Sequence, residues 1–271
     1  MLTMPKSYNY IGAFLTFRCN LGCDYCLNKQ GDFLPRPEMS GKRWIEGLEQ
    51  LETREDLPIT FQGGEPTLHK DFYEIAYQLH KKGKKLDLLT NGEFDIEDFI
   101  DNVSPDTFRR KAPYASIRFS FHKNTDENKL IDLVTALYKR NYSVGIWGLN
   151  IPDMEKRNKI VAGYCKDLGL DYREKEFLDE THGTYKYPVH LRGTLKECMC
   201  KPSELLIAPD GLVYRCHRDL YGSKGAYDHI SHSIKPMVDF ERCWWPKCNP
   251  CDVKLKTNRL QQGGHCSVEI Q

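Results

Sequence analysis

Strand-like and helix-like hydrophobic patterns alternate along the first two thirds of the chain. Short runs rich in apolar and β-branched residues, bounded by Gly, Asn or Pro, predict strands. Between them lie segments with a 3.6-residue period, which predict helices. The expected strands cover residues 10–17, 59–62, 85–89, 116–121, 143–149 and 171–177, and the expected helices cover residues 41–53, 71–82, 96–102, 127–140 and 154–168.

This alternation predicts an α/β fold with parallel strands and right-handed crossovers. The pattern alone does not separate an open doubly wound sheet from an incomplete barrel. In both architectures, ligands bind at the carboxyl ends of the strands. Unusual residues follow or end these strands in the sequence: Cys19, the stretch 63–66, Asn91, Ser120 and Asn150.

The last third of the chain has a different pattern. Residues 178–197 are polar and lack a clear period, which is typical of a linker. We therefore divide the chain into residues 1–177, a linker at 178–197 and a cysteine-rich domain at 198–271. In this domain the stretch SELLIAPDGLVYRC predicts a β-hairpin that would place Cys200 and Cys216 on neighbouring strands. A domain so short, with so little apolar core, needs a staple such as a metal.

Composition and charge limit the compartments and the partners that we expect for the chain. The 271 residues carry a formal net charge of +1, so no global charge directs the chain to nucleic acid or to a membrane surface. No apolar stretch approaches the roughly 20 residues that span a bilayer, and the N-terminus lacks the pattern of a signal peptide. We expect a cytoplasmic protein with no membrane partner and no nucleic-acid partner.

Eleven cysteines are many for such a chain, and their number is odd. Three lie at residues 19–26 and seven at residues 198–266, with only Cys165 between them, where a helical pattern suggests a small buried residue. Stable disulfides are rare in the cytosol. The clustering therefore favours metal binding over a disulfide framework.

The stretch FRCNLGCDYCLNK places three thiols in one loop, C-x3-C-x2-C. Cysteine-only ligation suits an iron–sulfur cluster or zinc. Zinc would require a fourth ligand nearby, and the loop offers none at the usual spacing. A [4Fe–4S] cluster with three protein ligands would keep one iron open for a small chelating ligand.

The residues at the other strand ends fit such a ligand. Gly63 and Gly64 have no Cβ, so the backbone there can approach a ligand closely. Glu65 and nearby backbone carbonyls can accept hydrogen bonds from an ammonium group, and Pro66 fixes the turn. Tyr25 can lay its ring against a base. The sequence therefore suggests a ligand with an amino-acid head and an adenine tail.

Two motifs occur together here. The first is C-x3-C-x2-C with an aromatic residue before the third cysteine, and the second is GGEP after the second strand. Together they resemble the motifs of the radical S-adenosylmethionine (SAM) enzymes. The resemblance covers residues 10–177 and implies a partial (β/α)6 TIM-like barrel. It implies that a [4Fe–4S] cluster binds SAM through its open iron. By the same resemblance, three cysteines hold that cluster and five further residues contact SAM: Cys19, Cys23 and Cys26, then Gly63, Gly64, Glu65, Ser120 and Asn150. Asn91 is a further family-like position that we count among the cofactor-binding residues, although its individual role is not fixed.

The C-terminal cysteines resemble the auxiliary-cluster domain of many radical SAM enzymes, in its short twitch form or its longer SPASM form. The resemblance implies a second [4Fe–4S] cluster, for which we expect the ligands Cys200, Cys216, Cys248 and Cys251, with Cys198 as the alternative to Cys200. Zinc remains the other possibility, because C-x2-C with outlying cysteines is also typical of zinc ribbons. Cys243 and Cys266 are either extra ligands, buried thiols or hydrogen-atom donors of the kind that radical epimerases use.

The resemblance implies an enzyme that cleaves SAM reductively to a 5′-deoxyadenosyl radical, with a flavodoxin or ferredoxin as electron donor. Its substrate stays open. We expect a small molecule, such as a sugar or cyclitol that is dehydrogenated or epimerised, which would make the enzyme an oxidoreductase or isomerase. The first alternative is a peptide or protein maturase that installs a crosslink, an epimer or an oxidised side chain. The second is a non-catalytic binding protein with a structural zinc tail.

Overall fold

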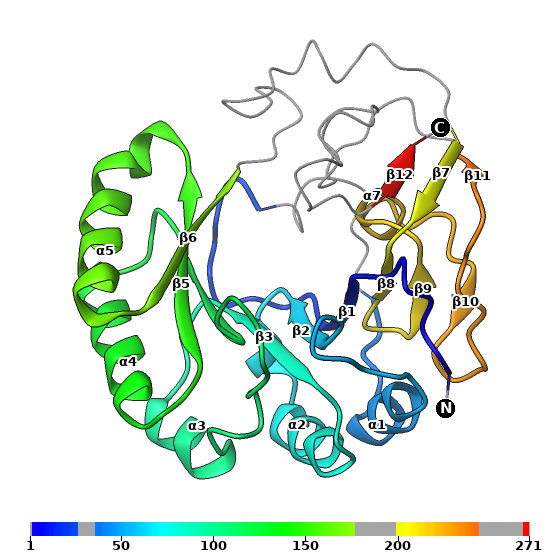
Figure 1. Ribbon diagram of the computed structural model, residues 1–271, viewed down its shortest axis with the longest axis horizontal. Coiled ribbons are helices and arrows are strands. Elements are labelled where there is room, and N and C mark those ends of the chain that lie inside the picture. Colours follow the sequence, from blue (N-terminus) through cyan, green and yellow to red (C-terminus); the bar gives the residue numbers. More distant parts are fainter. Residues whose placement is uncertain (1, 27–35, 177–198, 244–267, 271) are drawn as a thin grey trace.

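The computed structural model describes residues 2–26, 36–176, 199–243 and 268–270. They form a nine-stranded sheet and a separate three-stranded sheet (Figure 1). The strands are β1 (Tyr10–Thr16), β2 (Ile59–Gly63), β3 (Leu86–Thr90), β4 (Ile117–Phe121), β5 (Val144–Asn150), β6 (Asp171–Glu176), β7 (Met199–Pro202), β8 (Glu204–Ile207), β9 (Leu212–Tyr214), β10 (Asp228–His229), β11 (Glu241–Arg242) and β12 (Val268–Ile270). The helices are α1 (Gly41–Glu49), α2 (Phe72–Lys81), α3 (Ile96–Asn102), α4 (Glu127–Lys139), α5 (Glu155–Leu168) and α7 (His217–Tyr221), with short 3-10 turns η2 (Pro66–Leu68) and η3 (Pro152–Met154).

The first six strands are parallel and adjacent in sequence order, from β1 to β6. Helices α1 to α5 lie along the convex side of this curved sheet (Figure 1). The predicted partial (β/α)6 barrel is therefore confirmed, and the doubly wound alternative is wrong because the five helices do not cover both faces of the sheet. The carboxyl ends of the strands share one edge, which we call the rim.

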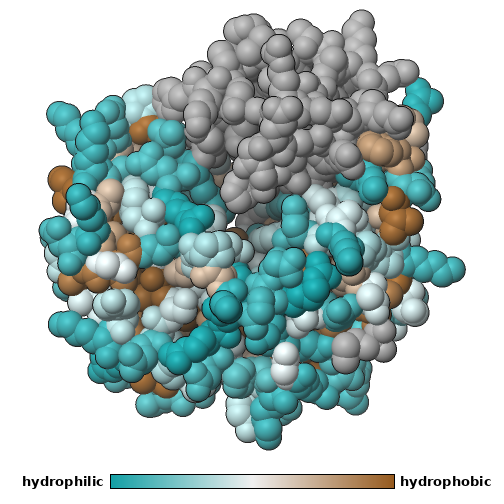
Figure 2. Space-filling model, in the orientation of Figure 1, coloured by the Kyte–Doolittle hydropathy of each residue, from teal (hydrophilic) through white to brown (hydrophobic). Residues whose placement is uncertain are grey.

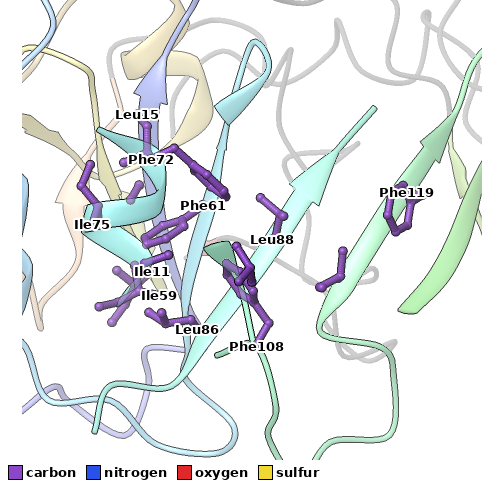
Figure 3. Close-up of a cluster of buried hydrophobic side chains, with 14 of the residues drawn as sticks. Ile11, Leu15, Ile59, Phe61, Phe72, Ile75, Leu86, Leu88, Phe108 and Phe119 are labelled. Carbon is purple, nitrogen blue, oxygen red and sulfur yellow. The ribbon is translucent and has the colours of Figure 1, made fainter. Parts of the chain in front are cut away.

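The core lies between the convex face of the sheet and these helices. Alternate residues along each strand, such as Ile59 and Phe61 on β2, point outward and pack against helix residues such as Phe72 and Ile75 (Figure 3). All four side chains are at most 1% exposed. Burial of this continuous apolar layer is the main stabilising contribution to the barrel.

The predicted hairpin forms from β8 and β9, which are antiparallel. It extends the barrel sheet, because β8 pairs with β1 in parallel. The prediction that the hairpin carries Cys200 beside Cys216 is wrong. Cys200 lies on β7, in the three-stranded sheet with β11 and β12, and Cys216 is the residue before α7. The partners of β7, which are β11 and β12, are distant in sequence, so the local pattern could not show that the chain changes sheets between β7 and β8.

One helix is shorter than its pattern predicts. Helix α1 ends at Glu49 instead of continuing to residue 53, because the next residues bridge to the N-terminus: Leu51 pairs with Leu2, and Glu52 N–H donates to Leu2 O.

Hydrophilic residues cover most of the face seen in Figure 2. Of the helices in the described ranges, none has both the length and the hydrophobicity of a membrane-spanning segment.

Candidate active site

The three-cysteine loop begins directly after β1, at the rim. Cys19 is exposed, Cys23 is buried and Cys26 is intermediate. The Leu21 N–H donates to Cys19 Sγ at 3.4 Å, and the Cys26 N–H donates to Cys23 O at 3.4 Å. No three Cys, His or acidic side chains of the described residues converge as they would on a single metal ion. A [4Fe–4S] cluster binds each thiolate on a different iron, and a donor set made of thiols alone fits such a cluster.

The two glycines after β2 are required by the neighbouring backbone. A Cβ on Gly63 would lie 2.1 Å from Thr16 O, and one on Gly64 would lie 2.0 Å from Arg18 O. The Gly64 and Glu65 N–H groups donate to these same carbonyls, each at 2.8 Å. Gly63 also has a φ of 141°, which L side chains rarely adopt. The glycines therefore fix the chain that leads into Cys19.

The Glu65 side chain is fully buried at the rim. Its carboxylate accepts hydrogen bonds from Thr67 N and Oγ1, from Thr90 Oγ1 at 2.9 Å and from Asn91 N at 2.7 Å. Burial raises the pKa of this carboxyl, and the hydrogen bonds oppose that rise. The carboxylate thus joins the end of β2 to the end of β3. Pro66 begins η2 directly after Glu65.

Asn91 carries this connection to the cysteine loop. Its Nδ2 donates to Asn20 Oδ1 at 2.8 Å and lies 3.7 Å from Cys19 Sγ. Its Oδ1 accepts from Glu93 N at 2.9 Å, and Asn20 Nδ2 donates to Glu93 O. In this structure Asn91 holds the loop at its first cysteine.

Tyr25 contacts the end of β4. Its hydroxyl lies 3.1 Å from His122 Nδ1 and accepts from Lys123 N at 3.2 Å, and the two rings are 5.9 Å apart. Burial, with a smaller effect of Lys175, lowers the pKa of His122 to about 4, so the ring is neutral near pH 7. The sequence analysis did not single out His122 and missed its contact with the cysteine loop.

Ser120 and Asn150 also lie near the rim. Ser120 is on the concave face of β4 and Asn150 is the last residue of β5, and both are partly exposed. The structure therefore brings residues from the ends of five parallel strands to one edge, as the sequence predicted. Whether each residue contacts a cofactor stays a prediction.

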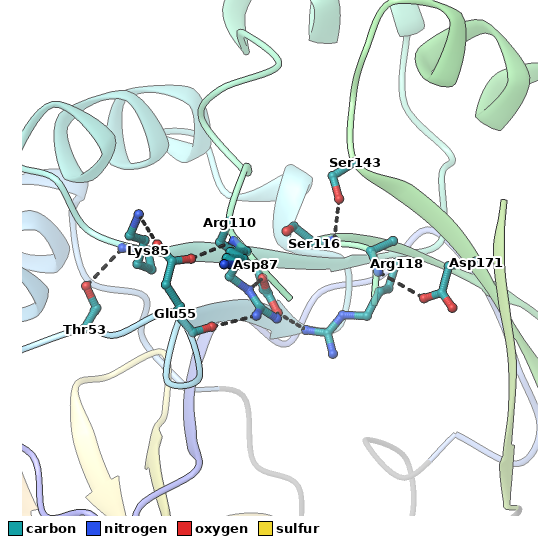
Figure 4. A network of polar contacts seen from close by, with 11 residues as sticks. Thr53, Glu55, Lys85, Asp87, Arg110, Ser116, Arg118, Ser143 and Asp171 are labelled. Atoms are coloured by element: carbon teal, nitrogen blue, oxygen red, sulfur yellow. Dashed lines mark hydrogen bonds and ion pairs between the residues drawn. The ribbon is translucent and has the colours of Figure 1, made fainter. Parts of the chain in front are cut away.

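The concave face of the sheet carries charges that the sequence analysis did not single out. Asp87 on β3 is bound by Arg110 Nε at 2.5 Å and by Arg118 Nη2 at 2.8 Å (Figure 4). All three side chains are at most 6% exposed. The Arg118 guanidinium lies 4.9 Å from the Trp147 ring centroid and 5.2 Å from that of Tyr114. The residues involved are far apart in sequence, so no local motif pointed to them.

Among the C-terminal cysteines, the structure describes Cys200, Cys216 and Cys243. Cys200 and Cys243 are buried, and Glu241, two residues before Cys243, pairs with Cys200. Burial raises the pKa of Cys216 well above its ordinary value. Asp219 and Cys243 act in the same direction, and Arg215 opposes them. Cys198, Cys248, Cys251 and Cys266 lie outside the described residues.

Arg36 joins the two cysteine regions. Its Nη1 donates to Tyr214 Oη at 2.8 Å, and its Nη2 donates to Ser223 Oγ at 2.8 Å and to Leu220 O at 3.3 Å. The guanidinium also pairs with Asp210 at 3.4 Å. These contacts flank Cys216, so the chain that returns from the first cysteine loop is held against the hairpin and α7.

A family model described as "Radical SAM superfamily" matches residues 14–160 of the chain, more than half of its length. Among curated proteins, the chain is 39% identical over 91 residues to a mitochondrial GTP 3′,8-cyclase of Arabidopsis thaliana, covering 32% of the chain and 23% of that protein. It is 36% identical over 103 residues to a PqqA peptide cyclase of Xanthomonas campestris, covering 38% and 27%, and 24% identical over 192 residues to a GTP 3′,8-cyclase of Clostridium botulinum, covering 69% and 56%. The matches thus span between about a quarter and just over half of these relatives.

Solved structures share the fold. Streptococcus suis SuiB superposes with a TM-score of 0.53 at 13% identity, over 84% of this chain and 64% of that chain. The anSMEcpe enzyme with bound AdoMet and a Cp18Cys peptide gives a TM-score of 0.53 at 16% identity, over 77% and 73%. BtrN in complex with AdoMet and 2-DOIA gives 0.50 at 17% identity, over 84% and 80%.

Proposed function

This chain belongs to the radical SAM superfamily, and from that membership we propose that it cleaves SAM reductively and abstracts a hydrogen atom from a substrate held inside its barrel. The observation that carries the proposal is the loop of Cys19, Cys23 and Cys26 at the rim, with thiols as its only ligand type. Membership implies SAM and one [4Fe–4S] cluster. Bound together, these supply a 5′-deoxyadenosyl radical.

The chain's own residues would position that chemistry. Cys19, Cys23 and Cys26 would hold the cluster, and the backbone of Gly63 to Glu65 would accept hydrogen bonds from the SAM ammonium. Tyr25 would lie against the adenine, with Ser120 and Asn150 near the ribose or carboxylate. Glu65 and Asn91 act through their neighbours, since their hydrogen bonds fix the loop that carries Cys19. Exclusion of water from the barrel protects a reactive intermediate.

We propose a small polar molecule as the substrate, dehydrogenated or epimerised in the barrel. Support comes from the concave face, where charged and polar side chains extend from the rim towards the Asp87 network. The second candidate is a peptide, because one relative is a PqqA peptide cyclase and one structural neighbour binds the precursor peptide SuiA. The proposed electron donor is a flavodoxin or ferredoxin.

The two substrate classes predict different stimulation of SAM cleavage. The reconstituted protein would be given SAM, a reductant and either the small-molecule filtrate or the peptide fraction of a cell extract, and 5′-deoxyadenosine would be measured by chromatography. Stimulation by the filtrate supports the first proposal. Stimulation by the peptide fraction alone overturns it in favour of a maturase.

We propose further that the C-terminal cysteines bind a second [4Fe–4S] cluster. The proposed ligands are Cys200, Cys216, Cys248 and Cys251. The burial of Cys243 favours a ligand role for Cys243 over hydrogen-atom donation. Cys198 stays the alternative to Cys200, and Cys266 a candidate hydrogen-atom donor.

Metal analysis of the Cys19/Cys23/Cys26→Ala triple variant, purified without oxygen, tests this second site. About four irons with matching sulfide would establish an auxiliary [4Fe–4S] cluster. About one zinc per chain would contradict it and indicate a structural tail.

A further inference from the structure

The concave face of the sheet is only partly covered, unlike the convex face. On β3, β4 and β5 the outward residues Leu88, Phe119 and Ile146 are fully buried. Their neighbours Leu89, Ser120 and Trp147, which point to the concave side, are partly exposed. The barrel interior therefore offers side-chain surface to a ligand.

Three buried nitrogen atoms on this concave face have no hydrogen-bond partner within the described part of the chain: Gln62 Nε2, Arg118 Nε and Trp147 Nε1. Each can donate a hydrogen bond and none can accept one. A buried donor without an acceptor destabilises the fold, and such groups are rare in native proteins. What the three atoms lack is an acceptor.

Strand register shows how these donors are arranged across the sheet. Phe61 pairs with Leu88, so Gln62 is level with Leu89, and Leu89 pairs with Arg118 on the next strand. The Gln62 amide lies over Gly12, where a Cβ would come within 2.3 Å of Nε2. The Arg118 guanidinium lies 4.9 Å from the Trp147 ring centroid. The Arg118 and Trp147 donors therefore lie together on β4 and β5, whereas the Gln62 amide extends over β1, away from them.

The charges around these donors favour an anion. Arg110 and Arg118 share the single carboxylate of Asp87, which leaves one positive charge in excess in that trio. Lys175 Nζ lies 4.7 Å from the Trp147 ring centroid on the neighbouring strand. Interactions between charges are stronger in a partly buried site than in water. A carboxylate or phosphate satisfies both the donors and the charge, whereas a neutral carbonyl satisfies only the donors.

We propose that Arg118 and Trp147 bind an anionic group of the substrate, a carboxylate or a phosphate, on the concave face of the sheet. This rests on the proposed function and assigns its substrate class. The SAM carboxylate is the other source of such a group. Arg118 lies four residues before His122, about 13 Å along an extended strand, so this anion site is well below the rim where we place SAM.

The test is calorimetric titration of the reconstituted holoenzyme with inorganic phosphate and with glutarate, each with and without saturating SAM and in the absence of a reductant. We expect both anions to bind with SAM present, and a neutral polyol not to bind. Arg118→Lys, which keeps the charge but removes Nε, should weaken binding about tenfold or more. Trp147→Phe, which keeps an aromatic ring, should weaken it about threefold to tenfold. Tyr138→Phe, an exposed tyrosine on α4, should bind like the wild type.

Three outcomes would overturn the proposal. They are no anion binding by the wild type, equal binding by the wild type and the Trp147→Phe variant, and competitive displacement of the anion by SAM, which would assign the donors to the SAM carboxylate. The Trp147→Phe variant should keep the wild-type melting temperature, so a loss of binding would not reflect unfolding. Failure of SAM cleavage would contradict the proposed function itself and is measured separately, as 5′-deoxyadenosine.

Discussion

The two faces of the barrel sheet differ sharply although they are built from the same strands. The convex face is apolar and fully buried, and residues such as Phe61, Phe119 and Ile146 pack against helices there. The concave face carries Asp87, Arg118 and Trp147, with buried donors that lack acceptors. Side chains alternate between the faces along each strand. Stability is thus concentrated on one face and binding chemistry on the other, and single substitutions can separate the two.

The largest loss of stability is expected on the convex face. Phe61 is fully buried against Phe72 and Phe108, so Phe61→Ala should lower the free energy of unfolding by about 3–5 kcal/mol. Denaturant titration measures this loss. Phosphate binding by the folded variant should stay close to that of the wild type, and a strong loss of binding would contradict the separation of the faces.

Removal of the Asp87 charge on the concave face should lower the stability of the fold and raise its affinity for phosphate. Asp87→Asn removes the carboxylate that two buried guanidinium groups share, which should destabilise the fold by about 3 kcal/mol or more. The same change leaves more positive charge beside Trp147, so phosphate affinity should rise. Thermal melting and calorimetry would measure the two effects. A fall in affinity in the folded variant would argue against the anion site.

At the rim, His122 should make stability depend on pH. Its pKa is lowered to about 4 in the fold, whereas an unfolded histidine titrates near 6.5. Between these values the unfolded state binds more protons, so stability should fall by about 3 kcal/mol as the pH drops from about 6.5 to 4. Denaturant titrations over this range would show the loss. His122→Gln should flatten the slope, and an unchanged slope would mean that other groups cause it.

The buried carboxylate at the rim should show a smaller effect that reaches the cysteine loop. In Glu65→Gln an amide NH2 replaces an oxygen that accepts hydrogen bonds, at a cost of about 1–3 kcal/mol. Because Glu65 holds Asn91 and Asn91 holds the loop at Cys19, iron retention should fall as well. Iron analysis and thermal melting test both effects. Lower stability with full iron retention would limit Glu65 to a structural role.

Two adjacent residues on β5 give the finest comparison. Ile146 is fully buried on the convex face, and Trp147 is partly exposed on the concave face. Ile146→Val should cost about 0.5–1.5 kcal/mol of stability with phosphate binding unchanged. Trp147→Phe should weaken phosphate binding with little change in stability. Identical behaviour of the two variants would remove the distinction between the faces.

The parts of this molecule that the sequence predicted are those with a local pattern. The six parallel strands follow from alternating periods, the hairpin of β8 and β9 from apolar runs around Pro209-Asp210-Gly211, and the candidate site from motifs at strand ends. The parts it missed join distant residues. Arg110 and Arg118 meet on Asp87, Arg36 meets Tyr214, and the Glu65 carboxylate turns to Asn91. Neither the hydrophobic period of a segment nor the spacing of a motif indicates such pairs.

The most direct measurement of the central claim is anaerobic SAM cleavage by the iron- and sulfide-reconstituted protein with a strong reductant. We predict that the wild type forms 5′-deoxyadenosine and methionine, that Cys23→Ser forms neither, and that Cys165→Ala, which alters a buried helix cysteine away from the site, cleaves SAM like the wild type. Wild-type protein that holds its iron but yields no 5′-deoxyadenosine, or equal yields from the Cys23→Ser variant, would contradict the account.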